Sequence, residues 1–188
     1  RRVLFRSVVL AEELLAHLQP LHLLGLTATP ERADGLDILQ WFDNRISVEL
    51  RLWDALEQGL LAPFHYFGLH DATDLSTLTW RSGAYDVSEL TSLYTAHDLR
   101  TSRIISEVNQ KIGDPQAMRA LGFCVSIAHA EHMAAAFLKS GINAKAITSR
   151  SPSQERASTL ASLAAGDVQA LFTVDLFNEG VDIPAIDV

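Results

Sequence analysis

Short apolar runs alternate with stretches in which apolar residues recur every three or four positions, most clearly in the second half of the chain. The first pattern is typical of buried strands, and the second of helices with one buried face. Because strands and helices alternate, the expected fold class is α/β, a parallel sheet with flanking helices on both faces. The pattern predicts strands at 120–127, 144–148 and 169–174 and helices at 99–112, 129–139 and 152–165, the last capped by Ser151.

The first part of the chain shows shorter elements. Residues 71–97 are more polar and lack a long apolar strand, which indicates a linker or a small helical insertion. We place a domain boundary before that segment, so that the expected domains are 1–58 and 59–188. In the first part we expect strands at 21–26, 46–50 and 64–69 and helices at 11–18, 36–42 and 53–58, the last ended by Gly59.

Composition narrows the function classes. The chain has 188 residues, of which 48% are hydrophobic, enough to bury a real core. No apolar run reaches the roughly 20 residues that span a bilayer, no secretory signal pattern is present, and Cys124 is the single cysteine, so we expect a cytoplasmic protein without a membrane partner. The net charge of −8 has the wrong sign for broad electrostatic binding of nucleic acid. Any nucleic-acid contact is therefore expected to be local.

Polar residues follow several of the expected strands, where open α/β sheets place their ligand sites. A hydroxyl and backbone amides at a helix start form a natural phosphate cradle, which makes Ser126 and His129 candidates. Gly180 allows close backbone approach, and Asp182 can accept a hydrogen bond from a ribose hydroxyl. The other candidates at strand ends are Thr27, Thr29, Thr148, Ser149, Arg150, Thr173 and Asp175.

Several of these candidates have an alternative explanation that involves no ligand. The threonine and serine hydroxyls can bond local backbone in turns, and Asp182 can be an exposed acid in a turn before Pro184. Cys124, His129 and His132 suggest a metal, but Cys124 should point into the sheet core, which leaves too few ligands. We therefore expect no metal site.

Three stretches, TATPER, FCVSIAHAEHMAAAF and FTVDLFNEGVDIP, resemble the third, fourth and fifth motifs of superfamily-2 helicases of the DEAD/DEAH type. The resemblance implies two RecA-like domains with ATP in the cleft and a nucleic-acid strand across both. Residues 1–58 would be the last part of the first RecA-like domain, and 59–188 most of the second. The wording EQGLLAPFHYFG and DLFNEGVDIP further resembles bacterial helicases linked to a phospholipase-D-like nuclease domain, although no HxK signature of that nuclease is present.

The resemblance also implies roles for the candidates. Thr27 and Thr29 would couple the nucleotide cleft to the strand-binding surface, and Gly180 and Asp182 would bind ATP. Nucleic acid, DNA in preference to RNA, would lie against Ser126, His129, Thr148, Ser149, Thr173 and Asp175. The family usually has threonine before that aspartate, and Val174 stands there in this chain.

Several motifs needed for ATP hydrolysis are missing from the sequence. Neither a GxxxxGK loop followed by Ser or Thr nor a magnesium-binding DExH box occurs, and the first aspartate is Asp34. The QxxGRxxR segment with its arginine finger is absent too, and the opening RRVLFRS resembles a translated adapter, so that the genuine sequence is expected to begin near Val8. We therefore expect a fragment whose complete parent is an ATP- and Mg²⁺-dependent helicase, and which is inactive alone.

Two other functions stay open. One is a non-catalytic RecA-like scaffold for a partner protein, which the net charge favours and the retention of Gly180 and Asp182 opposes. The other is the DNA-translocating subunit of a restriction or repair complex. An unrelated Rossmann-like enzyme is disfavoured because no GxGxxG follows any expected strand.

Overall fold

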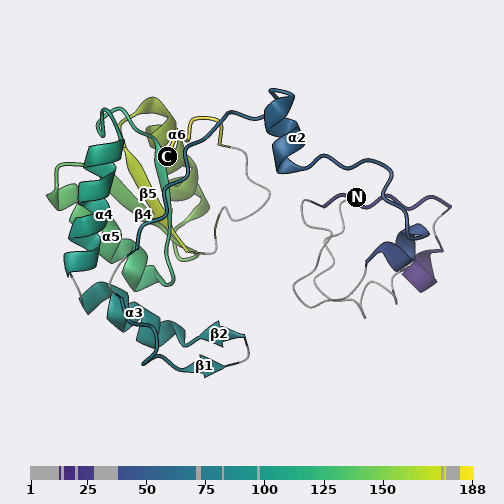
Figure 1. The fold of residues 1–188 in the computed structure, drawn as a ribbon, viewed down its shortest axis with the longest axis horizontal. Coiled ribbons are helices and arrows are strands. Elements are labelled where there is room, and N and C mark those ends of the chain that lie inside the picture. Colours follow the sequence, from purple (N-terminus) through teal and green to yellow (C-terminus); the bar gives the residue numbers. More distant parts are fainter. Residues whose placement is uncertain are drawn as a thin grey trace. The chain divides into compact units, whose positions relative to one another are not determined.

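The computed structural model describes residues 13, 15–19, 21–27, 38–70, 73–81, 83–96, 98–174, 176 and 183–188. The chain divides into two compact units, Arg1–Phe67 and Gly68–Val188. This division follows contacts within the chain and assigns neither unit to a RecA-like domain, so the domains 1–58 and 59–188 stay a prediction. Figure 1 shows the elements of each unit in chain order.

The first unit holds little regular structure in its described part. Residues 15–18 are helical, within the helix expected at 11–18. The helix expected at 36–42 appears as a short 3-10 helix, η1 (Leu39–Phe42), which ends at Asp43 in the left-handed conformation. The helix expected at 53–58 is confirmed as α2 (Leu52–Glu57), and Gly59 follows it with a φ of 67°, as a residue that ends a helix should.

The three strands expected in the first part of the chain are wrong. Residues 21–26, 46–50 and 64–69 form no strand, and their apolar side chains are exposed, Leu21 by 96% and Leu24 by 80%. A strand is stable only when neighbouring strands pair with its backbone. The described part of the first unit contains no such neighbour, so the apolar pattern alone produces no strand there.

The second unit is built around a three-stranded parallel sheet, which confirms the α/β class. Its strands are β3 (Ala120–Phe123), β4 (Ala144–Ile147) and β5 (Ala170–Thr173), in the order β3-β5-β4. Helix α5 (Ile127–Lys139) connects β3 to β4, and α6 (Ser153–Ala165) connects β4 to β5. These are the βαβ connections that a parallel sheet requires.

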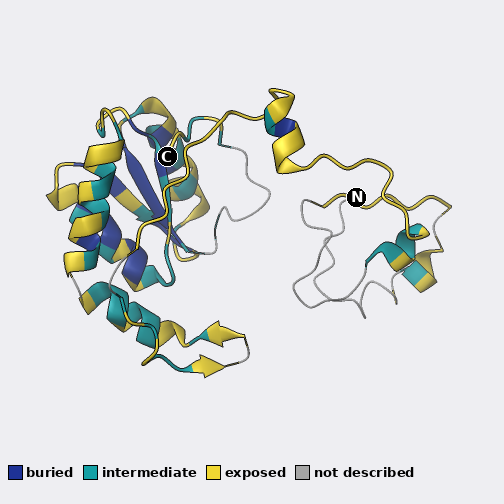
Figure 2. Ribbon diagram, viewed as in Figure 1, coloured by how far each residue is buried: buried dark blue, intermediate teal, exposed yellow. Residues whose placement is uncertain are grey.

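Two apolar cores lie on opposite faces of this sheet. Side chains along β5 alternate between them: Ala170 and Phe172 pack with α5 residues such as Met133, whereas Leu171 packs with Leu163 of α6. Both faces are therefore covered by helices. In Figure 2 the buried residues gather on the sheet and on α5, and the described part of the first unit is mostly exposed.

Some element boundaries differ from the predicted ones. The strand expected at 120–127 ends at Phe123, because Ser126 caps α5 and Ile127 already belongs to that helix. Ser151 is not the cap of α6: that position belongs to Pro152, and the Ser151 hydroxyl instead accepts a hydrogen bond from the Thr148 backbone N–H. Gly166 follows α6 as its C-cap residue, in the left-handed conformation.

The segment expected as a linker or helical insertion contains a helix and a hairpin. Strands β1 (Trp80–Arg81) and β2 (Ala84–Tyr85) pair antiparallel, and α3 (Val87–Ala96) follows them. The helix expected at 99–112 is confirmed as α4 (Asp98–Lys111). Both α3 and α4 contact α5, so the insertion is part of the packed second unit and not a separate tether.

Candidate functional site

The carboxyl ends of the three parallel strands bring several candidate residues to one edge of the sheet. In the register, Thr173 of β5 lies between Phe123 of β3 and Ile147 of β4. The segments that follow these strands, 124–126 and 148–150, therefore leave the sheet on either side of Thr173. Residues that are far apart in sequence share this edge because β5 is the central strand.

The turn from β3 into α5 is held by a helix cap. The Ser126 hydroxyl accepts a hydrogen bond from the His129 backbone N–H at 3.1 Å, and Ser126 itself has an extended backbone, as an N-cap residue should. The N–H groups of the first helical turn lack acceptors within the helix. Such a helix start, with its positive dipole end, suits an anion such as a phosphate.

His129 is buried and not on the surface, with only 5% of its area exposed. Its Nδ1 accepts a hydrogen bond from the Val125 backbone N–H at 3.4 Å, which assigns the ring proton to Nε2. Burial, the nearby Arg100 and then His132 lower the pKa of His129 to about 4. The imidazole is therefore neutral at pH 7, and its direct contact with nucleic acid stays a prediction.

The segment after β4 is a hydrogen-bonded turn. The Thr148 hydroxyl accepts from the Arg150 backbone N–H at 3.2 Å, and the Ser151 N–H donates to the Thr148 carbonyl at 3.0 Å. Thr148 is 6% exposed, whereas Ser149 and Arg150 are exposed. The turn alternative thus accounts for Thr148, and Ser149 and Arg150 are the side chains that reach solvent at this edge.

Thr173 is completely buried at the end of β5. Its carbonyl accepts a hydrogen bond from the Cys124 N–H at 2.8 Å, and its hydroxyl has no partner among the described residues. Cys124 packs against the core on the α5 side of the sheet, where burial raises the pKa of its thiol to about 11. A neutral thiol in this position is a core residue and not a nucleophile.

The remaining candidates divide between the first unit and the segments that are not described. Thr27 lies in the first unit and is exposed. Thr29, Asp175, Gly180 and Asp182 lie outside the described residues, so their predicted roles stay predictions. No group of three or more His, Cys, Asp or Glu residues in the described part of the chain could hold a metal ion. No helix of that part has the length and apolarity to cross a membrane.

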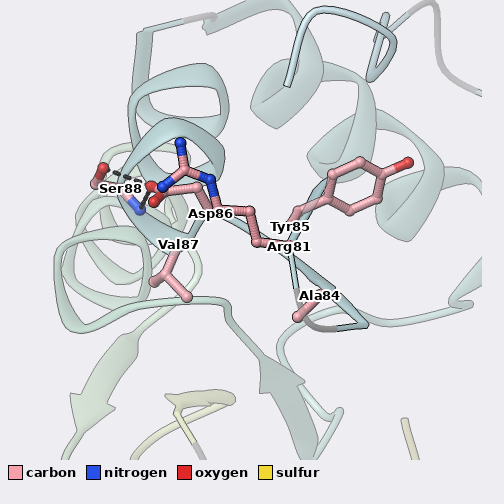
Figure 3. Close-up of a pocket in the computed structure, with 6 residues that line it drawn as sticks. All are labelled: Arg81, Ala84, Tyr85, Asp86, Val87 and Ser88. Atoms are coloured by element: carbon pink, nitrogen blue, oxygen red, sulfur yellow. Dashed lines mark hydrogen bonds between the residues drawn. The ribbon is translucent and has the colours of Figure 1, made fainter. Parts of the chain in front are cut away.

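A surface hollow of about 420 Å³ lies where the hairpin meets α3, and none of the candidate residues lines it (Figure 3). Asp86 lines it, but its carboxylate already accepts hydrogen bonds from the Ser88 hydroxyl at 2.6 Å and from the backbone N–H groups of Ser88 and Glu89. These bonds, the Ser88 hydroxyl first, lower the pKa of Asp86. The carboxylate therefore caps the start of α3 and offers no ligand chemistry.

Comparison with known proteins finds a family match within the second unit. Residues 102–188, which include α5, α6 and the whole parallel sheet, match the family described as helicase conserved C-terminal domain. This part of the chain is therefore similar to the conserved C-terminal domain of helicases.

Two protein relatives and one solved structure are similar to the chain. A 51.5 kDa protein of Lactococcus phage (isolate 7-9) is 28% identical over 162 residues, covering 86% of this chain and 34% of the relative. The yeast protein named "Putative ATP-dependent helicase IRC3" (Saccharomyces cerevisiae) is 24% identical over 164 residues, covering 87% of this chain and 24% of its own length. The Hef helicase domain of Pyrococcus furiosus superposes with a TM-score of 0.39 at 23% identity, over 48% of this chain and 18% of that structure. The chain thus spans about a third of the phage relative and a quarter of the yeast one.

Proposed function

We propose that this chain acts within an ATP-dependent superfamily-2 helicase or translocase that couples ATP hydrolysis to movement on nucleic acid, DNA in preference to RNA. The observation that carries the proposal is that the helicase C-terminal domain match covers the sheet whose strand ends gather the candidate residues. The name of the yeast relative, an ATP-dependent helicase, supports the same activity.

Within this function the second unit would bind the nucleic-acid backbone at the strand ends. The capped start of α5 would receive one phosphate, and Ser149 and Arg150 would hold the adjacent one, since both are exposed at the same edge. These contacts carry no base information, so the binding is expected to be independent of sequence. Gly180 and Asp182 would face the nucleotide, and Thr27 and Thr29 would couple it to the strand.

The residues of this chain do not fit a complete ATP–magnesium site. The sequence has no phosphate-cradling GxxxxGK loop and no DExH carboxylates to hold Mg²⁺. Bound ATP would supply the free energy for movement, and this chain would contribute its ribose side. We expect no phosphate release from the 188-residue chain alone. Release that nucleic acid stimulates and that Asp182→Ala abolishes would contradict this.

Fluorescence anisotropy with labelled single-stranded DNA and RNA oligonucleotides of equal length tests the binding. We expect the chain to bind, with the DNA bound more tightly, and Arg150→Glu to weaken binding to both. Arg103→Glu on α4, exposed and outside the sheet edge, is the matched charge reversal and should have a smaller effect. Equal losses in both variants would mean that binding follows net charge and not this site.

One observation favours a second function. This second function is a non-catalytic scaffold for a partner protein. The net charge of −8 favours it, because that charge opposes nonspecific attraction of nucleic acid. Absence of binding to both oligonucleotides at low salt would favour the scaffold.

A phospholipase-D-like nuclease domain in the same protein is a further part of the proposal, and nuclease activity of the whole protein would test it.

A further inference from the structure

Three side chains from three helices form a stack behind the start of α5. The Tyr94 ring of α3 lies against the His129 ring of α5, with centroids 5.2 Å apart and planes tilted by 36°. The Arg100 guanidinium of α4 lies 4.2 Å from the centroid of the same tyrosine ring, at a distance that gives a cation–π interaction. The inserted helix α3 thereby touches the candidate site through the Tyr94 side chain.

His129 passes this contact to the turn that precedes α5. Its Nδ1 accepts the Val125 N–H and its own backbone N–H bonds the Ser126 hydroxyl, so one residue holds both members of the turn. At the other end, the Cys124 N–H bonds the Thr173 carbonyl of the central strand. The turn is therefore fixed from the sheet on one side and from the imidazole on the other.

The imidazole can hold the Val125 N–H only while its Nδ1 is unprotonated. Among the described residues, the charged or titratable side chains that contact it or shift its pKa are Arg100 from α4, His132 from α5 and Tyr94 from α3. None of these is a carboxylate, and the Arg100 charge disfavours a second cation in the buried site. The Tyr94 ring shields the His129 imidazole from water and holds it near Arg100, which keeps Nδ1 unprotonated. Nδ1 can then accept the Val125 N–H and orient the turn.

We propose that Tyr94 is a positioning residue for nucleic-acid binding: its ring fixes the His129 imidazole, which in turn orients the Val125–Ser126 turn at the start of α5. The inference rests on the proposed function, because the turn is the proposed phosphate contact. It gives the inserted helix α3 a role in binding although it lies outside the matched residues 102–188.

The test compares Tyr94→Ala with Tyr94→Phe, using a labelled single-stranded DNA oligonucleotide and NMR of the His129 imidazole in the whole chain. We expect Tyr94→Ala to weaken binding about two- to tenfold, the range that an aromatic pair supplies, and to raise the His129 titration midpoint from about 4. Tyr94→Phe keeps the ring and should restore both values. Tyr85→Ala, which removes a tyrosine paired with Trp80 in the hairpin, is the matched control and should change neither.

The outcomes separate the two proposals. If wild type binds and Tyr94→Ala binds equally well with an unchanged His129 titration, the positioning role is overturned and the proposed function stands. If wild type binds neither DNA nor RNA, the proposed function fails and this inference fails with it. Tyr94→Leu keeps apolar volume without an aromatic ring, so a folded variant remains for the comparison if Tyr94→Ala unfolds. Tyr94→Leu should weaken binding and raise the His129 titration midpoint, as expected for Tyr94→Ala.

Discussion

The two units treat similar apolar sequence in opposite ways. Leu163 and Leu171 in the second unit are completely buried, whereas Leu21 and Leu24 in the first unit are 96% and 80% exposed. Both pairs of leucines lie in segments whose apolar pattern predicts strands or helices of an α/β fold. β5 becomes a strand because β3 and β4 pair with it on both sides, and the described residues of the first unit offer no pairing. An apolar run can thus form a strand, but it does so only when neighbouring strands pair with its backbone.

The helices differ in the same way. Helix α5 buries five residues, since it lies across β4 and β5 and under α3 and α4. Helix α2 of the first unit buries only Ala55. Most helical stability in proteins comes from packing one face of the helix. Stability of the described structure should therefore depend mainly on the second unit, and four predictions follow that difference from large to small effects.

The largest effect is expected from truncating the buried leucine of β5. Leu171→Ala should lower the free energy of unfolding by about 2–5 kcal/mol, because it removes buried methyl groups and leaves a cavity between the sheet and α6. Leu24→Ala in the first unit should change it by less than about 0.5 kcal/mol. Urea unfolding followed by circular dichroism measures both. Similar losses in the two variants would erase the contrast between the units.

Acidification should destabilise the second unit through His129. The folded-state pKa of about 4 lies below the ordinary value of about 6.5, so the unfolded chain takes up the proton first as the pH falls. The contribution of neutral His129 to the free energy of unfolding is fully present above about pH 6.5. It declines toward pH 4, by about 2–3 kcal/mol. His129→Gln should flatten this part of the stability–pH curve. An unchanged slope in that variant would assign the decline to other groups.

Glycine substitutions should distinguish a rigid contact from a loose one. A Cβ on Gly122 of β3 would collide with the Phe172 ring, which is itself held edge-on against Phe137 in the core. Gly122→Ala should therefore cost about 1–3 kcal/mol. A Cβ on Gly25 would also meet a ring, that of Phe42, but that ring is only half-buried and can move. Thermal unfolding of Gly25→Ala should match wild type, and equal losses would mean that the first unit is packed as tightly as the second.

The smallest effect concerns the helix caps. Ser126→Ala removes the hydroxyl that accepts the His129 N–H and should cost about 1 kcal/mol. In the first unit, Asp54 accepts the Arg51 N–H at 3.4 Å in an exposed place, so Asp54→Ala should cost no more than a few tenths of a kcal/mol. Urea midpoints report both values. A larger loss for Asp54→Ala would show that α2 matters more than its burial indicates.

Much of the second unit could be predicted because its patterns are local. Alternating apolar runs placed β3, β4 and β5 and the helices between them, and the errors there are shifts at the ends, as where Ser126 starts a helix before the expected strand finishes. The position of Ser126 at the start of a helix was also predicted, and its role in binding stays a prediction. The hairpin and the stack of Tyr94 on His129 were missed, because the partners lie on different elements and no spacing in the sequence relates them.

The solvent exposure of the candidate site residues could not be predicted for the same reason. Strand ends indicated Thr148, Ser149 and Thr173, but not which of their side chains would reach solvent. The structure buries Thr148 and Thr173 and exposes Ser149, because a turn closes over the first and the central position of β5 covers the second. The sequence also did not show that His129 would be buried beneath an inserted helix.

The sequence by itself determined the α/β class, the helicase motifs and the residues at the ends of the strands, since these depend on short-range periodicity and on residue type. The tertiary structure decided which apolar runs became strands, which hydroxyls became buried and which helix supports the start of α5. Those outcomes depend on strand pairing and burial between segments that are distant in the chain. The free energy of such contacts depends on several elements together, so the local pattern of one segment does not predict it.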